Sequence, residues 1–132
     1  MTTTTTTTTI TYETQPYSGF HMVCDIKEIQ QMDILNDIES LKILLDIICT
    51  KYDFHILQKI EHKFEPHGST IIYMLSESHI SIHTFPEKKY MAFDIYTCRN
   101  YTDNSTYTWI YEYLIKTFDA KKEEPNIICR NF

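Results

Sequence analysis

A serine and a histidine in the middle of the chain have the residue types and the spacing for nucleophilic chemistry. Residues 70–75 form a β-branched and apolar run, and residues 79–85 alternate at the two-residue period of a half-buried strand. Ser78 therefore lies where one strand ends and the next begins, and His83 follows five residues later. A hydroxyl held rigidly at such a junction suits nucleophilic attack, and an imidazole suits proton transfer. The same spacing also fits a hairpin corner with an outward-facing histidine.

These two residues belong to a longer pattern. Three blocks agree in order and spacing with one signature: Ser76-Glu77-Ser78-His79, Ile82-His83-Thr84-Phe85-Pro86-Glu87 and Asp94-Ile95-Tyr96-Thr97-Cys98. Agreement upstream is thinner, at His62-Lys63-Phe64, Pro66, Gly68 and Leu35-Asn36-Asp37. On these motifs the sequence resembles the prokaryotic-type S-adenosylmethionine decarboxylase proenzymes, over residues 20 to 120.

The resemblance implies a proenzyme that cleaves itself between Glu77 and Ser78. Ser78 Oγ would attack the Glu77 carbonyl carbon, and β-elimination would then leave a pyruvoyl group at position 78. His83 matches the family's processing histidine, and Thr70 stands where the family often has a serine that supports processing. The pyruvoyl ketone would form a Schiff base with the substrate amine and so replace pyridoxal phosphate. No metal is implied.

The resemblance also implies a substrate and an assembly. The expected reaction is the decarboxylation of S-adenosylmethionine in spermidine biosynthesis, with Cys98 as the proton donor to the substrate carbon. Phe64 matches a residue that stacks on adenine, and Glu87 matches one that accepts hydrogen bonds from the ribose hydroxyls. Two protomers share each active site in this family, so we expect a homodimer. In it, Ser78 and Cys98 of one chain face Phe64, His83 and Glu87 of its partner.

The sequence departs from the family after the first expected strand. Asp25 stands where a glutamate is usual, and Lys27 and Glu28 replace aromatic and glycine character. A pyruvoyl-dependent decarboxylase of ornithine or arginine therefore stays open as an alternative. A non-catalytic homologue that regulates an active decarboxylase is a second alternative, although retention of Ser78, His83 and Cys98 speaks against it. Activation by a polyamine such as putrescine depends on which acidic side chains converge among Asp25, Glu28, Glu61 and Asp94.

Composition excludes several other functions. The chain of 132 residues suffices for one domain that buries about two thirds of its unfolded surface. A net charge of -6 without a basic run speaks against nucleic-acid binding. The two glycines, Gly19 and Gly68, cannot build a phosphate-binding loop or a dinucleotide fingerprint. No apolar run has the length of a membrane span and no secretory signal precedes the four cysteines, so we expect free thiols in the cytoplasm.

The other cysteines and histidines suggest structural roles. We expect buried core thiols at Cys24, Cys49 and Cys129. The remaining imidazoles have no metal-ligand spacing and are expected to be solvated or hydrogen-bonded: His21, His55, His62 and His67. For His79 a structural role and a processing role both stay open.

Periodicity predicts the elements that position these residues. Strands are expected at residues 20–26, 55–62, 70–75, 80–85, 91–97 and 126–129, and helices at residues 33–51 and 105–120. Asp33 is the expected N-cap of the first helix. Short connections imply antiparallel neighbours, so the fold class is α+β, a two-layer sandwich of an antiparallel sheet with two helices on one face, like S-adenosylmethionine decarboxylase. The threonine-rich residues 1–19 are expected to form a disordered tail before a single domain of residues 20–132.

Overall fold

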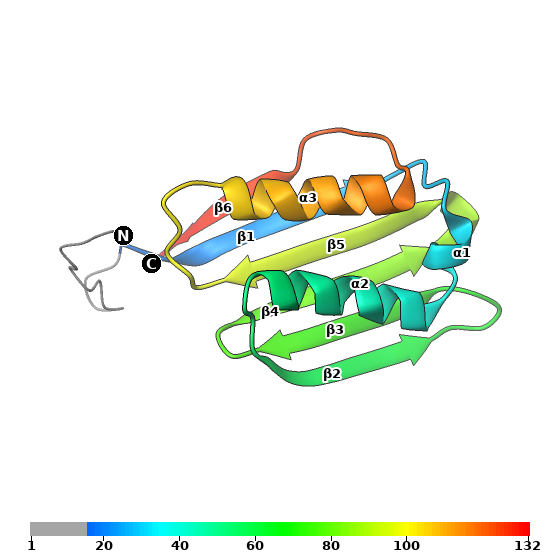
Figure 1. Ribbon diagram of the computed structural model, residues 1–132, viewed down its shortest axis with the longest axis horizontal. Helices are drawn as coiled ribbons and strands as arrows, with labels where there is room; N and C mark the ends of the chain where they lie inside the picture. Colours follow the sequence, from blue (N-terminus) through cyan, green and yellow to red (C-terminus); the bar gives the residue numbers. More distant parts are fainter. Residues whose placement is uncertain (1–15) are drawn as a thin grey trace.

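The computed structural model describes residues 16–132 as a six-stranded sheet with helices over one face (Figure 1). In chain order the elements are β1 (Tyr17–Ile26), α1 (Met32–Leu35), α2 (Ile38–Lys51), β2 (Ile56–Lys63), β3 (Ser69–Leu75), β4 (Ser78–Phe85), the 3-10 helix η1 (Pro86–Lys88), β5 (Tyr90–Thr97), α3 (Ser105–Phe118) and β6 (Asn126–Asn131). The threonine run lies outside the described residues. The expectation that the first strand starts at Phe20 is wrong, because β1 already pairs with β6 at Tyr17. A register shift between Tyr17 and Gly19 breaks the alternation that would have revealed this pairing.

The sheet order is β2-β3-β4-β5-β1-β6, and every neighbouring pair is antiparallel. The four consecutive strands β2 to β5 form a meander, whereas β1 lies between β5 and β6. Helices α2 and α3 lie side by side over the same face of this sheet (Figure 1). The predicted α+β two-layer sandwich is therefore confirmed.

The first helical segment differs from its prediction, because two helices replace the single helix expected over residues 33–51. The chain leaves helical geometry between Leu35 and Ile38, and Asp37 caps α2 with its Oδ2 atom 3.2 Å from the Ser40 backbone nitrogen. Asp33 lies inside α1, so its assignment as the N-cap is wrong. The apolar spacing runs across this break because Leu35 of α1 and Leu41 of α2 both enter the same core.

The core fills the space between the helices and one face of the sheet. Alternate residues of each inner strand point into it, as in β5, where Met91, Phe93 and Ile95 are buried. Partly exposed apolar side chains on the opposite face of the sheet include Val23, Ile60, Ile72, Met74 and Ile128. No helix within residues 16–132 covers this second face, which we call the open face (Figure 1).

The cysteines divide into buried and accessible thiols. Cys24 and Cys49 are buried, as expected, and burial raises their pKa values to about 12 and about 11. Cys129 is exposed on the edge strand β6, so its assignment to the core is wrong. Cys98 is partly buried just after β5.

Candidate active site

Ser78 begins β4 after a two-residue connection from β3, which confirms its position at a strand junction. It pairs with Thr97 of β5, so Cys98 follows directly at the same end of the sheet. A pocket of about 230 Å³, which we call the Ser78 pocket, opens around this junction. Its lining residues are Phe54, His55, Leu75, Ser76, Glu77, Ser78 and Arg99. The bond between Glu77 and Ser78 therefore lies beside a cavity at the surface of the sheet's end.

The opposite end of β4 carries the other predicted residues. A pocket of about 350 Å³, the Phe64 pocket, is lined by Phe64, His67, Gly68, Ser69, Thr70, His83, Thr84, Phe85 and Glu87. Thr70 Oγ1 lies 3.1 Å from His83 Nδ1 across the β3–β4 pair. Glu87, in η1, lies with one carboxylate oxygen 3.6 Å from His67 Nε2. The structure thus brings Phe64, Thr70, His83 and Glu87 together in one cavity.

The two pockets of one chain are too far apart to act on the same atoms. Ser78 and His83 lie five positions apart on a continuous strand, and at about 3.3 Å per residue their backbones lie about 16 Å apart. Their closeness in sequence therefore does not produce contact. One chain therefore carries its predicted site residues in two groups at opposite ends of its sheet.

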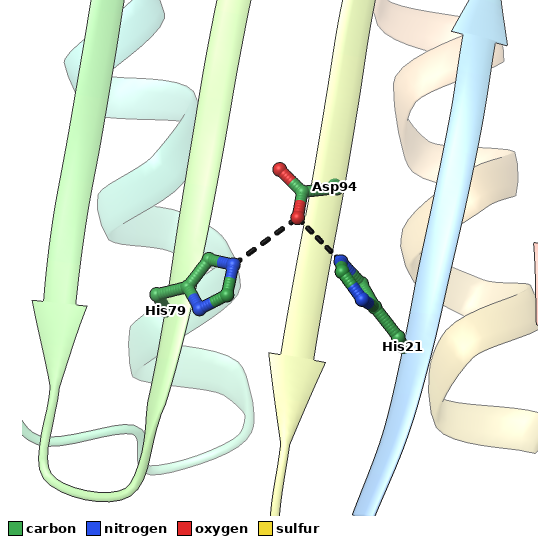
Figure 2. Close-up of side chains that lie close together, drawn as sticks. All are labelled: His21, His79 and Asp94. Atoms are coloured by element: carbon green, nitrogen blue, oxygen red, sulfur yellow. Dashed lines mark hydrogen bonds and ion pairs between the residues drawn. The ribbon is translucent and has the colours of Figure 1, made fainter. Parts of the chain in front are cut away.

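A third cluster, which the sequence reasoning missed, lies between these two groups on the open face and consists of His21, His79 and Asp94 (Figure 2). Asp94 Oδ2 lies 2.6 Å from His21 Nε2 and 3.1 Å from His79 Nε2. His21 of β1 and His79 of β4 both stand opposite Tyr96 of β5 in the register. In the sequence, the alternation of three strands was the one pattern that could have indicated this cluster. It was not sufficient, because only the strand order places β1 and β4 on either side of β5. The expectation that His21 is hydrogen-bonded is confirmed.

These three groups have ligand atoms within 4.8 Å of one another, which is a spacing that a metal ion could use. Their hydrogen bonds describe a different state. Arg130 Nη1 lies 3.1 Å from His21 Nδ1, and because a guanidinium only donates, Nδ1 must accept. In this arrangement the His21 proton is on Nε2, where it is donated to Asp94. The cluster is a hydrogen-bond network centred on Asp94.

The charge of Asp94 is stabilised by this network. Burial alone would raise the pKa of Asp94, but hydrogen bonds from Ser81, His21 and His79 together lower the pKa below its usual value. Asp94 is therefore an ionised acceptor at neutral pH. The other acidic side chains considered for a polyamine site have partners of their own: Asp25 accepts from Tyr90, Glu61 pairs with Lys42, and Glu28 lies near Lys121.

Cys98 lies at the end of a second chain of hydrogen bonds. Its sulfur is 3.9 Å from the Tyr96 hydroxyl, which donates to Ser18 Oγ over 2.9 Å. Ser18 in turn donates to the backbone oxygen of Arg130. The ring of Tyr96 packs against both His21 and His79. The Cys98 thiol is thus held at a defined place beside the Ser78 end of β4.

Comparison with known proteins identifies the class of this arrangement. The fold matches the crystal structure of the adenosylmethionine decarboxylase from Aquifex aeolicus with a TM-score of 0.76 and 26% sequence identity, covering 89% of this chain and 94% of that chain. The architecture is accordingly that of a two-layer sandwich of the adenosylmethionine decarboxylase type.

Sequence relatives define the family. The family model described as S-adenosylmethionine decarboxylase matches residues 20–131. An S-adenosylmethionine decarboxylase proenzyme of Sulfurihydrogenibium is 36% identical over 112 residues, covering 85% of this chain and 81% of that protein. A proenzyme of the same description from Clostridium botulinum is 37% identical over 114 residues, covering 86% and 95%. The chain belongs to the S-adenosylmethionine decarboxylase family.

Proposed function

We propose that this chain is a self-processing, pyruvoyl-dependent decarboxylase that converts S-adenosylmethionine to its decarboxylated form and CO2. The product is an aminopropyl donor for spermidine biosynthesis. The observation that carries the proposal is the placement of two half-sites, with Ser78 and Cys98 at one end of the sheet and Phe64, His83 and Glu87 in one cavity at the other. Family membership supplies the reaction.

Self-cleavage is proposed to begin at the Ser78 hydroxyl. Oγ attacks the Glu77 carbonyl carbon, the peptide C–N bond breaks, and an ester joins Glu77 to the Ser78 side chain. A base then removes the Ser78 Cα proton, the Cβ–O bond breaks, and Glu77 leaves with a terminal carboxylate. The resulting enamine takes up one water and releases ammonia, which leaves a ketone at position 78.

The residues around Ser78 fit such a group. The scissile bond lies at the end of a connection that contains only Ser76 and Glu77, so a break there leaves the pairing of β3 with β4 intact. The Ser78 pocket gives the new chain start a cavity, and Cys98 directly follows Thr97, the pairing partner of Ser78. When formed, the pyruvoyl ketone supplies a carbonyl that holds the substrate amine and accepts the electron pair released with CO2.

His83 of one chain is proposed as the base that removes the Ser78 Cα proton of its partner. An imidazole has an ordinary pKa close to neutrality, which suits proton abstraction at that pH. Thr70 Oγ1 lies 3.1 Å from Nδ1 and can hold the ring in one orientation and one tautomer. Thr70 is therefore proposed to support processing through His83.

Cys98 is proposed to donate a proton to the substrate carbon after CO2 leaves. Among the four thiols, Cys24 and Cys49 are buried and stay protonated, and Cys129 lies on the edge strand β6. Cys98 combines partial exposure with a fixed position next to Thr97, the pairing partner of Ser78. These contacts favour Cys98 over the other thiols.

Substrate recognition is proposed for the Phe64 pocket. Phe64 is 48% exposed, so its aromatic side chain is accessible for stacking on adenine. Glu87 lines the same cavity and presents carboxylate oxygens that can accept from ribose hydroxyls.

A homodimer with shared active sites is proposed because each chain contains both half-sites about 16 Å apart. A two-fold axis places one end of a sheet next to the opposite end of the partner's sheet. The dimer then has two complete active sites, and each chain contributes one half-site to each of them. The partly exposed apolar side chains of the open face supply a surface for this contact. Among the described residues no helix is long and apolar enough to cross a membrane. The cytoplasmic setting stays a prediction.

Two experiments test the proposal. Intact-protein mass spectrometry should find two fragments that split between Glu77 and Ser78, with a ketone in place of the serine amine on the smaller, C-terminal one, whereas Ser78→Ala should stay whole. An uncut wild-type chain would favour a regulatory homologue. Release of labelled CO2 should then be compared for S-adenosylmethionine, ornithine and arginine. Faster turnover of ornithine or arginine would exclude the proposed substrate.

A further inference from the structure

Arg99 places a cation in the Ser78 pocket, and neither the family motif nor the proposed mechanism uses it. Its guanidinium packs on the Phe54 ring, with Cζ 4.4 Å from the ring centroid. One terminal nitrogen donates to the Tyr52 backbone oxygen and the other lies 2.6 Å from the Asp53 backbone oxygen. The end of helix α2 therefore holds this side chain against the pocket wall.

The charge of Arg99 has no carboxylate partner within residues 16–132, since its polar side-chain contacts there are two neutral carbonyl oxygens. The Arg99 side chain is partly buried, so an anion placed beside its guanidinium would offset the cost of removing this charge from water. A guanidinium carries five N–H groups, so further donors remain for such an anion. The pocket that Arg99 lines also contains both residues of the scissile bond, Glu77 and Ser78.

Self-cleavage creates an anion at this place. When the Cβ–O bond of the ester breaks, its electron pair stays on the oxygen that leaves with Glu77, and the Cα–H electrons form the Cα=Cβ bond. The leaving group is the new terminal carboxylate of the N-terminal fragment. A fixed cation that faces the developing charge lowers the barrier of that step.

Resting on the proposed self-cleavage, we propose that Arg99 stabilises the carboxylate that leaves from Glu77 during β-elimination. The carboxylate of the substrate is the other anion that reaches this end of the sheet. An ion pair to that group would stabilise the substrate ahead of CO2 loss, which slows decarboxylation. Arg99 therefore acts in the formation of the active enzyme.

The test follows cleavage of freshly made, uncleaved chain from cell-free synthesis, with and without hydroxylamine, which cuts esters. Arg99→Gln should cleave at least about tenfold more slowly than wild type, because this factor corresponds to the loss of one hydrogen bond to a charged group in the transition state. Its ester should accumulate, so hydroxylamine should release the two fragments rapidly. Lys122→Gln removes one cation from an exposed pair with Glu112 and should cleave at the wild-type rate.

Three results would overturn the assignment. The first is cleavage of Arg99→Gln at the wild-type rate. The second is slow cleavage of Arg99→Gln without accumulation of a hydroxylamine-sensitive ester. The third is a folded Arg99→Lys chain that cleaves as slowly as Arg99→Gln. The lysine variant keeps the charge and covers the case in which Arg99→Gln does not fold. A wild-type chain that never cleaves would instead refute the proposed function, so the two failures are distinguishable.

Discussion

Thr70 Oγ1 and His83 Nδ1 lie 3.1 Å apart across the β3–β4 pair, inside the Phe64 pocket. If His83 is the processing base, this contact sets the orientation of its ring. His83→Ala should slow self-cleavage about a hundredfold or more, the usual value of a positioned base. Time-resolved mass spectrometry of newly made chain measures the rate.

The same contact gives a graded comparison at position 70. Thr70→Ser keeps a hydroxyl and should cleave at a rate close to wild type, whereas Thr70→Val keeps the shape and should be slower. Equal rates for these two variants would show that the hydroxyl has no part in processing.

Shared active sites predict complementation between two inactive chains. Cys98→Ala damages the half-site at the Ser78 end, and Glu87→Gln damages the half-site in the Phe64 pocket. Co-expressed chains that pair at random should form heterodimers in half of the assemblies, each with one intact site of two. About a quarter of the wild-type activity should return.

The matched control for complementation joins two lesions of the same half-site, Phe64→Ala with Glu87→Gln, and should restore nothing. Activity in the control, or none in the mixed pair, would contradict sites shared between protomers.

Asp94 should stabilise the fold in a pH-dependent manner. Its pKa is lowered in the folded state, so its contribution is fully present above the ordinary value of 3.8 and is lost as the pH falls through the lowered folded pKa. Asp94→Asn should cost about 1–3 kcal/mol of unfolding free energy at pH 7, and this difference should shrink in acid. Urea unfolding of both proteins across pH 2.5 to 7 measures it. A difference that grew in acid would contradict the role of Asp94 as an ionised acceptor.

The helix break at Asp37 predicts unequal effects of two similar substitutions. Asp37→Ala removes the cap of α2 and should lower the melting temperature by a few degrees. Asp33→Ala removes a carboxylate inside α1 that makes no cap and should have a smaller effect. Circular dichroism melts compare the two, and a larger loss for Asp33→Ala would restore the single-helix interpretation.

Local patterns predicted the elements but not all of their relationships. The alternation from His79 to Phe85 and the motif around it placed Ser78 at the start of a strand and Cys98 beside its neighbour. The break before Asp37 was missed because the apolar spacing is the same on both sides. The convergence of His21 with Asp94 needed the pairing of β1 with β5, which no local rule supplies. The chemical roles of Ser78, His83 and Cys98 stay predictions.

The strand order has a consequence for the cleaved protein. A break before Ser78 assigns β1, β2 and β3 to one fragment and β4, β5 and β6 to the other. In the sheet, β1 lies between β5 and β6, and β3 pairs with β4, so the fragments interleave along three ladders. The nicked domain therefore holds together without a covalent link. Once denatured, however, each nicked domain must refold by the encounter of two fragments, so the folding of the domain itself depends on concentration, whereas the domain of the uncut precursor folds from a single chain.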